Sequence, residues 1–257
     1  MIPAVPPFIH LGSLQIPLFF LVISLSLSGL LFYLSYRVNT FSKNRKIAFE
    51  LALLVMISSF IGARLMHVFY EEWAYYRLNP LYILYFWNGG FVYYGGLLFS
   101  LITGYLYIQY QKINFSEWAD FFTPLFSSGH ALGRLGCFLS GCCYGAHCTL
   151  PWAISEKHPT ALYLIAGELI LFLMLLFFEK KQICKLQGSL FLIWLLLHGL
   201  LRFIVEFFRD DPRGPLFSMP FLGFLSVSQL ISLAIIIGCL FVCFFVLFYY
   251  KNNSLKK

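Results

Sequence analysis

The chain contains 257 residues, of which 60% are hydrophobic, 20% are aromatic and only 11% are charged. Soluble domains carry about a quarter charged residues, so this composition disfavours a soluble enzyme, a disordered protein and a small secreted disulfide-rich module. The class that fits is an integral membrane protein. The formal net charge of +7 raises the question of nucleic-acid binding, which the positions of the charges answer.

Seven apolar runs, each near the roughly 20 residues that cross the hydrocarbon core as a helix, predict an all-α polytopic membrane protein. The runs are continuous, whereas the strands of a β-barrel alternate between apolar and polar residues. The predicted spans are 16–36, 48–70, 91–110, 118–139, 160–178, 190–208 and 225–250. The fourth is the weakest and is interrupted by glycines. We expect residues 1–257 to form a single integral membrane domain. No Lys or Arg precedes the first run and no clear cleavage site follows it, so we expect this run to remain in the fold.

Most of the basic residues follow the odd-numbered spans. Eleven of the eighteen do so: Arg37, Lys43, Arg45, Lys46, Lys112, Lys180, Lys181, Lys185, Lys251, Lys256 and Lys257. Basic loops are typically cytoplasmic, which predicts an external N-terminus and a cytoplasmic C-terminus. The excess positive charge is therefore interpreted as a topology signal, and we expect no nucleic-acid partner.

Three arginines, Arg64, Arg134 and Arg202, fall inside predicted spans. A charge at membrane depth costs several kcal/mol and persists where it meets a counter-ion, a water-filled cavity or an anionic ligand. Guanidinium groups bind phosphate oxygens bidentately, so the three together suggest a phosphate-bearing substrate. Structural pairing is the alternative, since three acidic residues are available inside the spans: Glu50, Glu168 and Glu206.

The sixth span ends in a charged stripe. Arg202, Glu206 and Arg209 are spaced i, i+4 and i+7, which puts them on one face of a helix. Anchoring of a helix end at the membrane interface explains Arg209 but not Arg202, which lies two turns deeper.

The segment 129–163 is rich in glycine and cysteine. The spacing of its glycines is typical of close helix packing. Arg134, which lies between these glycines, is not needed for such packing. Its four cysteines, Cys137, Cys142, Cys143 and Cys148, lie within twelve residues together with His147. A disulfide, free packing thiols and, less favoured by the spacing, a zinc site remain open. The histidines inside the spans are expected to be polar packing groups: His67, His130 and His198.

With these residues in view, the chain resembles the bacterial prolipoprotein diacylglyceryl transferases. The motifs that carry the resemblance are GAR at 62–64, WNGGFVYYGG at 87–96, GRLGCF at 133–138 with Gly141 and Gly145, HPTALY at 158–163, and Arg202-xxx-Glu206-xx-Arg209. They are similar, in this order, to the family's GARL, WxGGxxxHGG, GRxGNFxNGExxG, HPSQLYE and RxxxExxR elements. Each motif alone is weak, whereas their order and spacing together are fairly specific.

The resemblance implies an enzyme of the bacterial inner (plasma) membrane that transfers the diacylglyceryl group of phosphatidylglycerol to the lipobox cysteine of a prolipoprotein signal peptide. It implies Arg134, Arg202 and Tyr94 as catalytic residues. Substrate-binding roles are implied for Arg64, Gly95, Gly96, Cys137, Gly145, His158, Glu206 and Arg209. No metal or other cofactor is expected.

Several positions depart from the family motifs. Tyr94 stands where the family has a histidine, and Cys137, Ser140 and Cys142 replace its two asparagines and its glutamate. A thiol titrates near 8.5 and a phenol near 10, so the loss of the histidine removes the obvious base for the acceptor thiol. Two alternatives therefore stay open: a divergent paralogue that binds phospholipid or transfers its groups to another acceptor, and, with less support, an anion transporter.

Overall fold

A computed structural model describes residues 8–11, 14–86, 89–141, 143–184, 186–210 and 225–254. Apart from a two-stranded antiparallel hairpin formed by β1 (Phe8–Leu11) and β2 (Leu14–Pro17), its regular elements are helices. The expected helical architecture is thereby confirmed. Outside the described residues lie Trp87, Asn88, Cys142, Lys185, Lys256 and Lys257.

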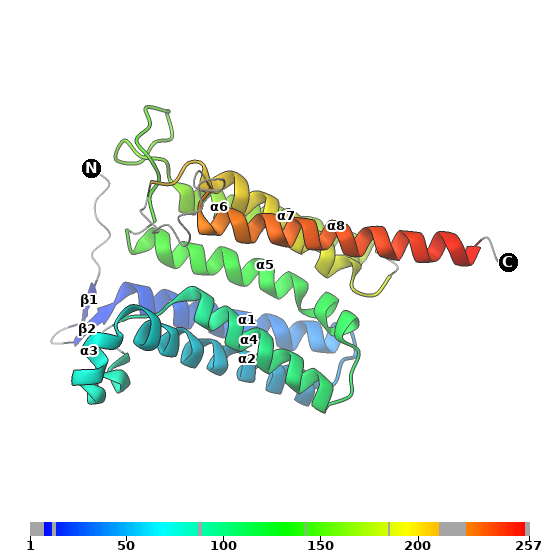
Figure 1. The fold of residues 1–257 in the computed structure, drawn as a ribbon, viewed down its shortest axis with the longest axis horizontal. Coiled ribbons are helices and arrows are strands. Elements are labelled where there is room, and N and C mark those ends of the chain that lie inside the picture. The colour runs from blue at the N-terminus through cyan, green and yellow to red at the C-terminus, as the bar shows by residue number, and fades with distance from the viewer. Residues whose placement is uncertain are drawn as a thin grey trace. The chain divides into compact units, whose positions relative to one another are not determined.

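Seven long helices coincide with the seven predicted runs (Figure 1). They are α1 (Leu18–Thr40), α2 (Arg45–Met66), α4 (Tyr93–Tyr110), α5 (Phe115–Leu139), α6 (Thr160–Lys180), α7 (Ser189–Glu206) and α8 (Val227–Ser254). Five segments among the described residues are long and apolar enough to cross a membrane: Leu21–Thr40, Arg45–Glu71, Thr160–Lys180, Ser189–Glu206 and Ser228–Phe245. The chain is thus a multi-pass membrane protein.

Short helices occupy the connection between α2 and α4, which the hydropathy pattern did not resolve. The π-helix η1 (His67–Glu71) prolongs α2, and α3 (Trp73–Leu78) and the 3₁₀-helix η2 (Pro80–Leu84) follow it. Large aromatic side chains along this connection are exposed, among them Trp73, Tyr75 and Tyr82. Tryptophan and tyrosine are enriched where a membrane meets water, which fits a connection at the end of two spans.

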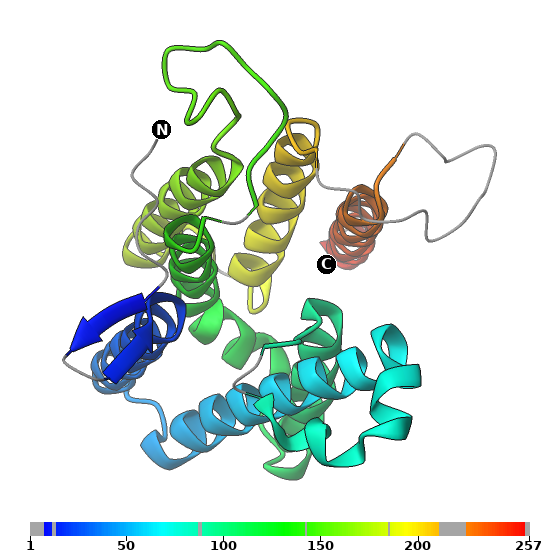
Figure 2. The ribbon, with the colours of Figure 1, turned by 90° about the vertical axis from the view of Figure 1, so that its left-hand side faces the viewer.

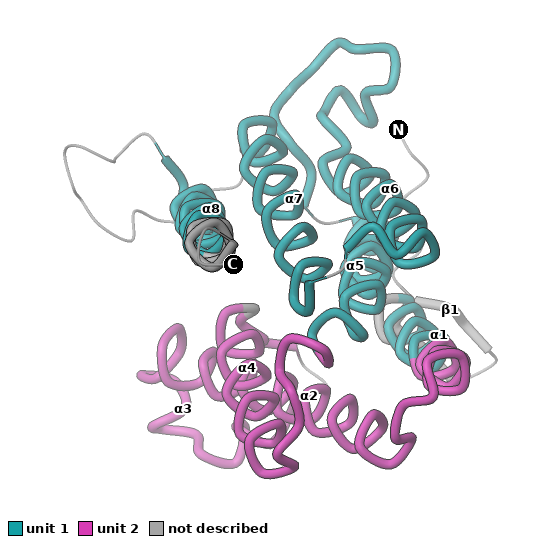
Figure 3. Tube along the Cα trace, turned by 90° about the vertical axis from the view of Figure 1, so that its right-hand side faces the viewer, with its two compact units in different colours: residues 1–30, 119–257 teal, residues 31–118 magenta. Residues whose placement is uncertain are grey.

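The described chain divides into two compact units (Figure 3). One comprises residues 1–30 and 119–257, and the other comprises residues 31–118. The first unit contains α6, α7, α8 and most of α5, whereas the second contains α2, α3 and α4. The prediction of a single membrane domain stays a prediction.

Glycines bring α2 and α4 into close contact in the second unit. A Cβ atom added to Gly62 would lie 2.5 Å from the backbone oxygen of Gly95, and one added to Gly96 would lie 2.9 Å from the backbone oxygen of Ser59. Side chains at these positions would force the two helices apart, so the seam requires small residues. Gly95 and Gly96, which were expected to bind substrate, therefore have a packing role in this structure.

Polar side chains cap the helix ends. Asn44 Oδ1 accepts a hydrogen bond from the backbone N–H of Ile47 at the start of α2. In the first unit, the Asp120 carboxylate accepts from the backbone N–H groups of Gly188 (2.7 Å) and Phe191 (2.9 Å) at the start of α7. These three contacts satisfy N–H groups that have no partner within the helix itself.

Candidate functional site

The three arginines predicted at membrane depth have different partners. Arg64, near the end of α2, is buried, and its guanidinium donates to five backbone carbonyls of the connection between α2 and α4. The acceptors are the oxygens of Ile83 for Nε, Gly89 and Gly90 for Nη1, and Tyr82 and Tyr85 for Nη2, at 2.6–3.3 Å. An arginine has five N–H donors, and here all five are used. Arg64 has none left for a phosphate oxygen, so the geometry favours a structural role over the expected anion-binding one.

The glycines at 89 and 90 make this arrangement possible. Both adopt positive φ angles, +85° and +79°, a region that residues with a Cβ atom rarely occupy. A Cβ atom on Gly90 would also lie 2.8 Å from Arg64 Nη1. The glycine pair of the loop motif is therefore required by the backbone turn around Arg64.

Tyr94 is the second residue of α4 and is 36% exposed. It lies in the same unit as Arg64, whereas the residues of segment 129–209 lie in the other unit. A role for Tyr94 at the transfer site stays a prediction.

Arg202 belongs to a buried charged group at the end of α7. Its Nη2 atom lies 3.2 Å from Glu206 Oε2 and 3.4 Å from Ser228 Oγ at the start of α8. Ser226 Oγ donates to Glu206 Oε1 at 3.0 Å, and Arg209 Nε lies 3.9 Å from Glu206 Oε2. The predicted stripe of Arg202, Glu206 and Arg209 is therefore one ion-paired cluster, in which a single carboxylate contacts two guanidinium groups.

The long connection between α5 and α6 folds back toward the end of α7 (Figure 2). Gly145 pairs with Arg209 in an antiparallel bridge, and its backbone N–H donates to the His158 carbonyl at 2.8 Å. A Cβ atom on Gly145 would lie 2.7 Å from the Cβ of His158. The structure thus brings together Gly145, His158 and Arg209, three of the predicted site residues that are far apart in sequence.

His158 is further fixed by its side chain. Its Nδ1 atom lies 3.0 Å from the Tyr163 hydroxyl, which also accepts a hydrogen bond from Trp152 Nε1 at 2.9 Å. His158 also packs against the ring of Phe208, with centroids 5.0 Å apart. These contacts give His158 a role in holding the connection in place.

The cysteine-rich part of this connection is only partly described. The Cys143 carbonyl accepts from Thr160 Oγ1 at 2.6 Å, and Cys148 is buried. His147 is exposed, with Nε2 3.4 Å from Glu156 Oε2. Among the described residues, ligand atoms suited to a metal converge elsewhere, at His130, Glu168 and His198.

Arg134 lies on α5, one turn after His130, and is half-buried. Its Nε atom donates to His130 Nε2 at 3.4 Å. Its two Nη groups make no hydrogen bond to any residue within the described ranges. Cys137, on the following turn, is also half-buried. Within the described residues, the guanidinium of Arg134 therefore retains donors for an anion, whereas that of Arg64 does not.

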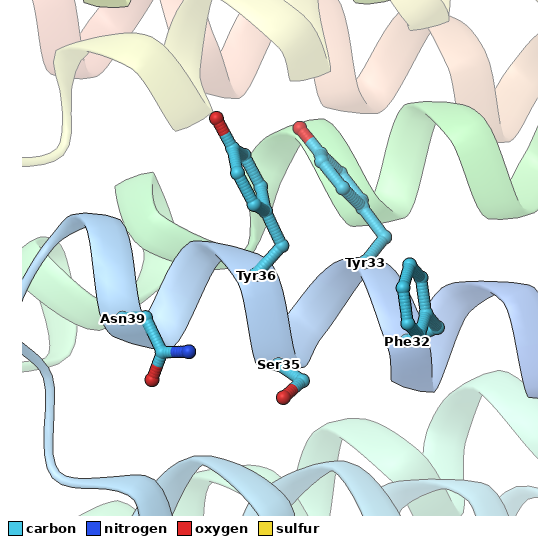
Figure 4. A pocket seen from close by; sticks show the side chains of 5 residues that line it. All are labelled: Phe32, Tyr33, Ser35, Tyr36 and Asn39. Carbon is cyan, nitrogen blue, oxygen red and sulfur yellow. The ribbon is translucent and has the colours of Figure 1, made fainter.

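Sequence reasoning missed the polar cluster around Glu168. His130 and His198 were expected to be packing groups, yet the Nδ1 atoms of both contact Glu168 Oε1, in the case of His130 at 3.2 Å. The i, i+4 spacing of His130 and Arg134 on α5 signals only their mutual contact, and no local pattern signals the contacts with Glu168. A hollow of about 360 Å³ lies on α1 and contains none of the predicted site residues. It is lined by Phe32, Tyr33, Ser35, Tyr36 and Asn39, and the two tyrosines project from the same side of the helix (Figure 4).

Comparison with known proteins agrees with the motifs. Residues 6–245 match the family described as prolipoprotein diacylglyceryl transferase. Proteins named phosphatidylglycerol–prolipoprotein diacylglyceryl transferase are similar to the chain: that of Finegoldia magna is 37% identical over 69% of this chain and 70% of its own length, and that of Clostridium tetani is 30% identical over 92% and 96%. A third, from Mannheimia succiniciproducens, is 34% identical over 77% of this chain and 75% of its own length. The match spans nearly the whole chain and includes the segments that hold Arg134 and Arg202, and the chain belongs to the prolipoprotein diacylglyceryl transferase family.

Proposed function

We propose that the chain transfers the diacylglyceryl group of phosphatidylglycerol to the lipobox cysteine of prolipoproteins. The cysteine sulfur attacks the carbon of the diacylglyceryl group that is bonded to the phosphate oxygen. A C–S bond forms, the C–O bond between this carbon and the phosphate breaks, and glycerol 1-phosphate leaves. The thiol proton passes to a base. Membership of the transferase family supports this activity, and no observation favours a transporter or a different acceptor.

The observation that carries the proposal is the state of Arg134. Its Nη groups hydrogen-bond to no described residue, whereas Arg64 is saturated by carbonyls and Arg202 is paired with Glu206. A guanidinium with free Nη groups suits two phosphate oxygens. Negative charge builds on the phosphate as the C–O bond breaks, and a fixed cation in a water-poor site stabilises it strongly. Arg134 is thus the proposed phosphate ligand.

Arg202 and Arg209 supply further positive charge in the same proposal. Glu206 holds both guanidinium groups, and Gly145 and His158 hold the connection that reaches Arg209. Arg64 is assigned the different task of holding the turn that precedes α4. Gly95 and Gly96 are assigned to the packing of α4 on α2.

We also propose seven spans with an external N-terminus and a cytoplasmic C-terminus in the bacterial inner membrane. The seven long helices and the basic residues after the odd-numbered ones support this topology. Helix α5, which is not among the five apolar segments, carries Glu117, Asp120, His130 and Arg134. A helix that lines a polar site is expected to be less apolar than one that faces lipid. Phosphatidylglycerol then enters from the bilayer, at its outer face.

Complementation tests the proposal directly. In bacterial cells depleted of their own prolipoprotein diacylglyceryl transferase, expression of this chain is expected to restore growth and diacylglyceryl-modified prolipoprotein, measured by mass spectrometry of a reporter lipoprotein. The control is the Arg134→Ala variant at equal abundance in the membrane. Unmodified reporter despite normal expression and insertion of the unaltered chain would contradict the proposal.

Tyr94 is proposed to donate a hydrogen bond to the phosphate or an ester oxygen of the lipid. Tyr94→Phe removes the hydroxyl and keeps the ring, so we expect a loss of about tenfold in transfer rate, the size of one hydrogen bond to a charged group. The measurement is transfer by purified protein, with Tyr105→Phe, an exposed tyrosine on the same helix, as the matched control. Equal rates for both variants would reduce Tyr94 to a packing residue.

A further inference from the structure

The fully buried carboxylate of Glu168 on α6 gathers donors from two other helices. Its Oε1 atom contacts His130 Nδ1 of α5 at 3.2 Å and His198 Nδ1 of α7. Its Oε2 atom accepts from Ser127 Oγ of α5 at 2.8 Å and from Trp194 Nε1 of α7 at 3.3 Å. Three hydrogen bonds, from Ser127, Trp194 and His198, and the contact with His130 thus surround the two oxygens, which compensates much of the cost of burying the charge.

The contacts fix the tautomer of His130. Nε2 accepts from the N–H of Arg134 Nε, so Nε2 carries the lone pair and the proton of the neutral His130 ring lies on Nδ1, the atom that faces the Glu168 carboxylate. Arginine only donates, and Arg134 Nε lies 3.4 Å from that Nε2 atom. Arg134 Nε–H thus donates to His130 Nε2, and on the other side of the ring His130 Nδ1 lies 3.2 Å from Glu168 Oε1, a charge contact whose geometry is not that of a hydrogen bond.

We propose that Glu168 and His130 are positioning residues that hold Arg134 for its substrate. This inference rests on the proposed function, in which Arg134 binds the lipid phosphate. With Nε held by His130, rotation of the guanidinium is restricted and its two Nη groups form the edge offered to phosphate oxygens. A preformed site avoids the entropic cost of ordering a long side chain when the ligand binds.

The imidazole between Glu168 and Arg134 also keeps the two charges apart. A carboxylate in direct contact with the Nη groups would compete with phosphate for them, as Glu206 does at Arg202, where Nη2 and Oε2 are 3.2 Å apart. At Arg134, the neutral ring of His130 transmits the orientation without occupying the Nη groups. The negative charge of Glu168 still balances the positive charge of the guanidinium.

A metal ion is the competing interpretation of this cluster. His130, Glu168 and His198 each offer a ligand atom, and these atoms lie within 4.8 Å of one another. A metal bound at His130 Nδ1 would move the ring proton to Nε2, where it would face the N–H of Arg134 Nε. Two donors would then oppose each other at 3.4 Å. The contact with Arg134 therefore favours a metal-free His130 with its proton on Nδ1.

Matched variants on the two sides of Glu168 test the inference. His130→Leu and His198→Leu each remove one imidazole from the same carboxylate oxygen, but only His130 contacts Arg134. We expect His130→Leu to weaken phosphatidylglycerol binding and to slow transfer by about 10- to 100-fold, the effect of one hydrogen bond to a charged group. His198→Leu is expected to lose similar thermal stability and to bind and transfer like the unaltered protein.

His130→Gln is the rescue variant. A carboxamide both donates and accepts, so its amide nitrogen replaces Nδ1 toward Glu168 and its oxygen replaces Nε2 toward Arg134. We expect binding and transfer to recover most of what His130→Leu loses. Equal losses in His130→Leu and His198→Leu, or no recovery with His130→Gln, would show that the cluster only supports folding and would overturn the inference.

Two measurements on the unaltered protein complete the test, including the case in which His130→Leu does not insert. Nitrogen-15 NMR of labelled histidine, assigned with His130→Gln, is expected to show the proton of His130 on Nδ1, and metal analysis is expected to show no stoichiometric ion. A proton on Nε2, or one bound metal per chain, overturns the inference. Binding of phosphatidylglycerol, with diacylglycerol as the phosphate-free control, separates the two proposals: a chain that binds the lipid through His130 and Arg134 but transfers nothing contradicts only the proposed function.

Discussion

Arg134→Ala is expected to abolish diacylglyceryl transfer while the protein remains folded and inserted. Removal of a fixed group that stabilises developing charge costs about 100- to 1,000-fold in rate, and Arg134 is the proposed ligand of the leaving phosphate. The side chain makes one described hydrogen bond, to His130, so its loss disturbs few contacts of the fold. The measurement is transfer from phosphatidylglycerol to a lipobox peptide by purified protein, with thermal unfolding in the same detergent.

Arg64→Ala provides the contrast, because this arginine is buried and engaged by five carbonyls. Its removal is expected to lower stability, since each buried polar group left without a partner costs about 1–3 kcal/mol. Arg134→Lys keeps the charge without the planar fork and is expected to recover only part of the activity. Unchanged transfer by Arg134→Ala would contradict the phosphate-binding role.

The long helices were predictable because their signal is local. An apolar run can be recognised from its own residues, without knowledge of the rest of the fold. The predicted run 118–139, for example, begins three residues after the start of α5 and ends at the same residue as α5. The connection 67–84 was not resolved into η1, α3 and η2, because its aromatic residues carry no clear period of either 2 or 3.6. The β1–β2 hairpin overlaps the first predicted run, 16–36, only at its last two residues and is too short to give an apolar run of its own.

The candidate site was predictable only in its residue types. Arg64, Arg134 and Arg202 were grouped because each is a charge in an apolar run, and that property is the same whether the partner is a carbonyl, a carboxylate or a ligand. The structure distinguishes them because their partners come from other segments: Arg64 meets residues 18–26 positions away. The contact of Glu168 with His130 and His198 depends on the rotation of three helices about their axes, which hydropathy does not report.

The pairing of Arg202 with Glu206 predicts that a substitution of Arg202 lowers the stability of the protein as well as its activity. Arg202→Met leaves the buried Glu206 carboxylate, which is 7% exposed, without the guanidinium 3.2 Å away. Removal of one partner of a buried ion pair costs about 3–5 kcal/mol. We therefore expect Arg202→Met to lower both the stability and the transfer activity, so that activity alone does not separate structure from catalysis.

The double variant Arg202→Met, Glu206→Gln separates them. Glutamine removes the unbalanced charge and keeps an oxygen that accepts from Ser226 Oγ, as Glu206 Oε1 does at 3.0 Å. We expect unfolding in detergent to return toward that of the unaltered protein, whereas transfer stays low because one positive charge of the proposed phosphate site is still missing. Glu206→Gln alone is the matched control for the effect on Arg209. If the double variant recovers transfer along with stability, Arg202 acts only as the partner of Glu206, and the phosphate is then bound by Arg134 without its help.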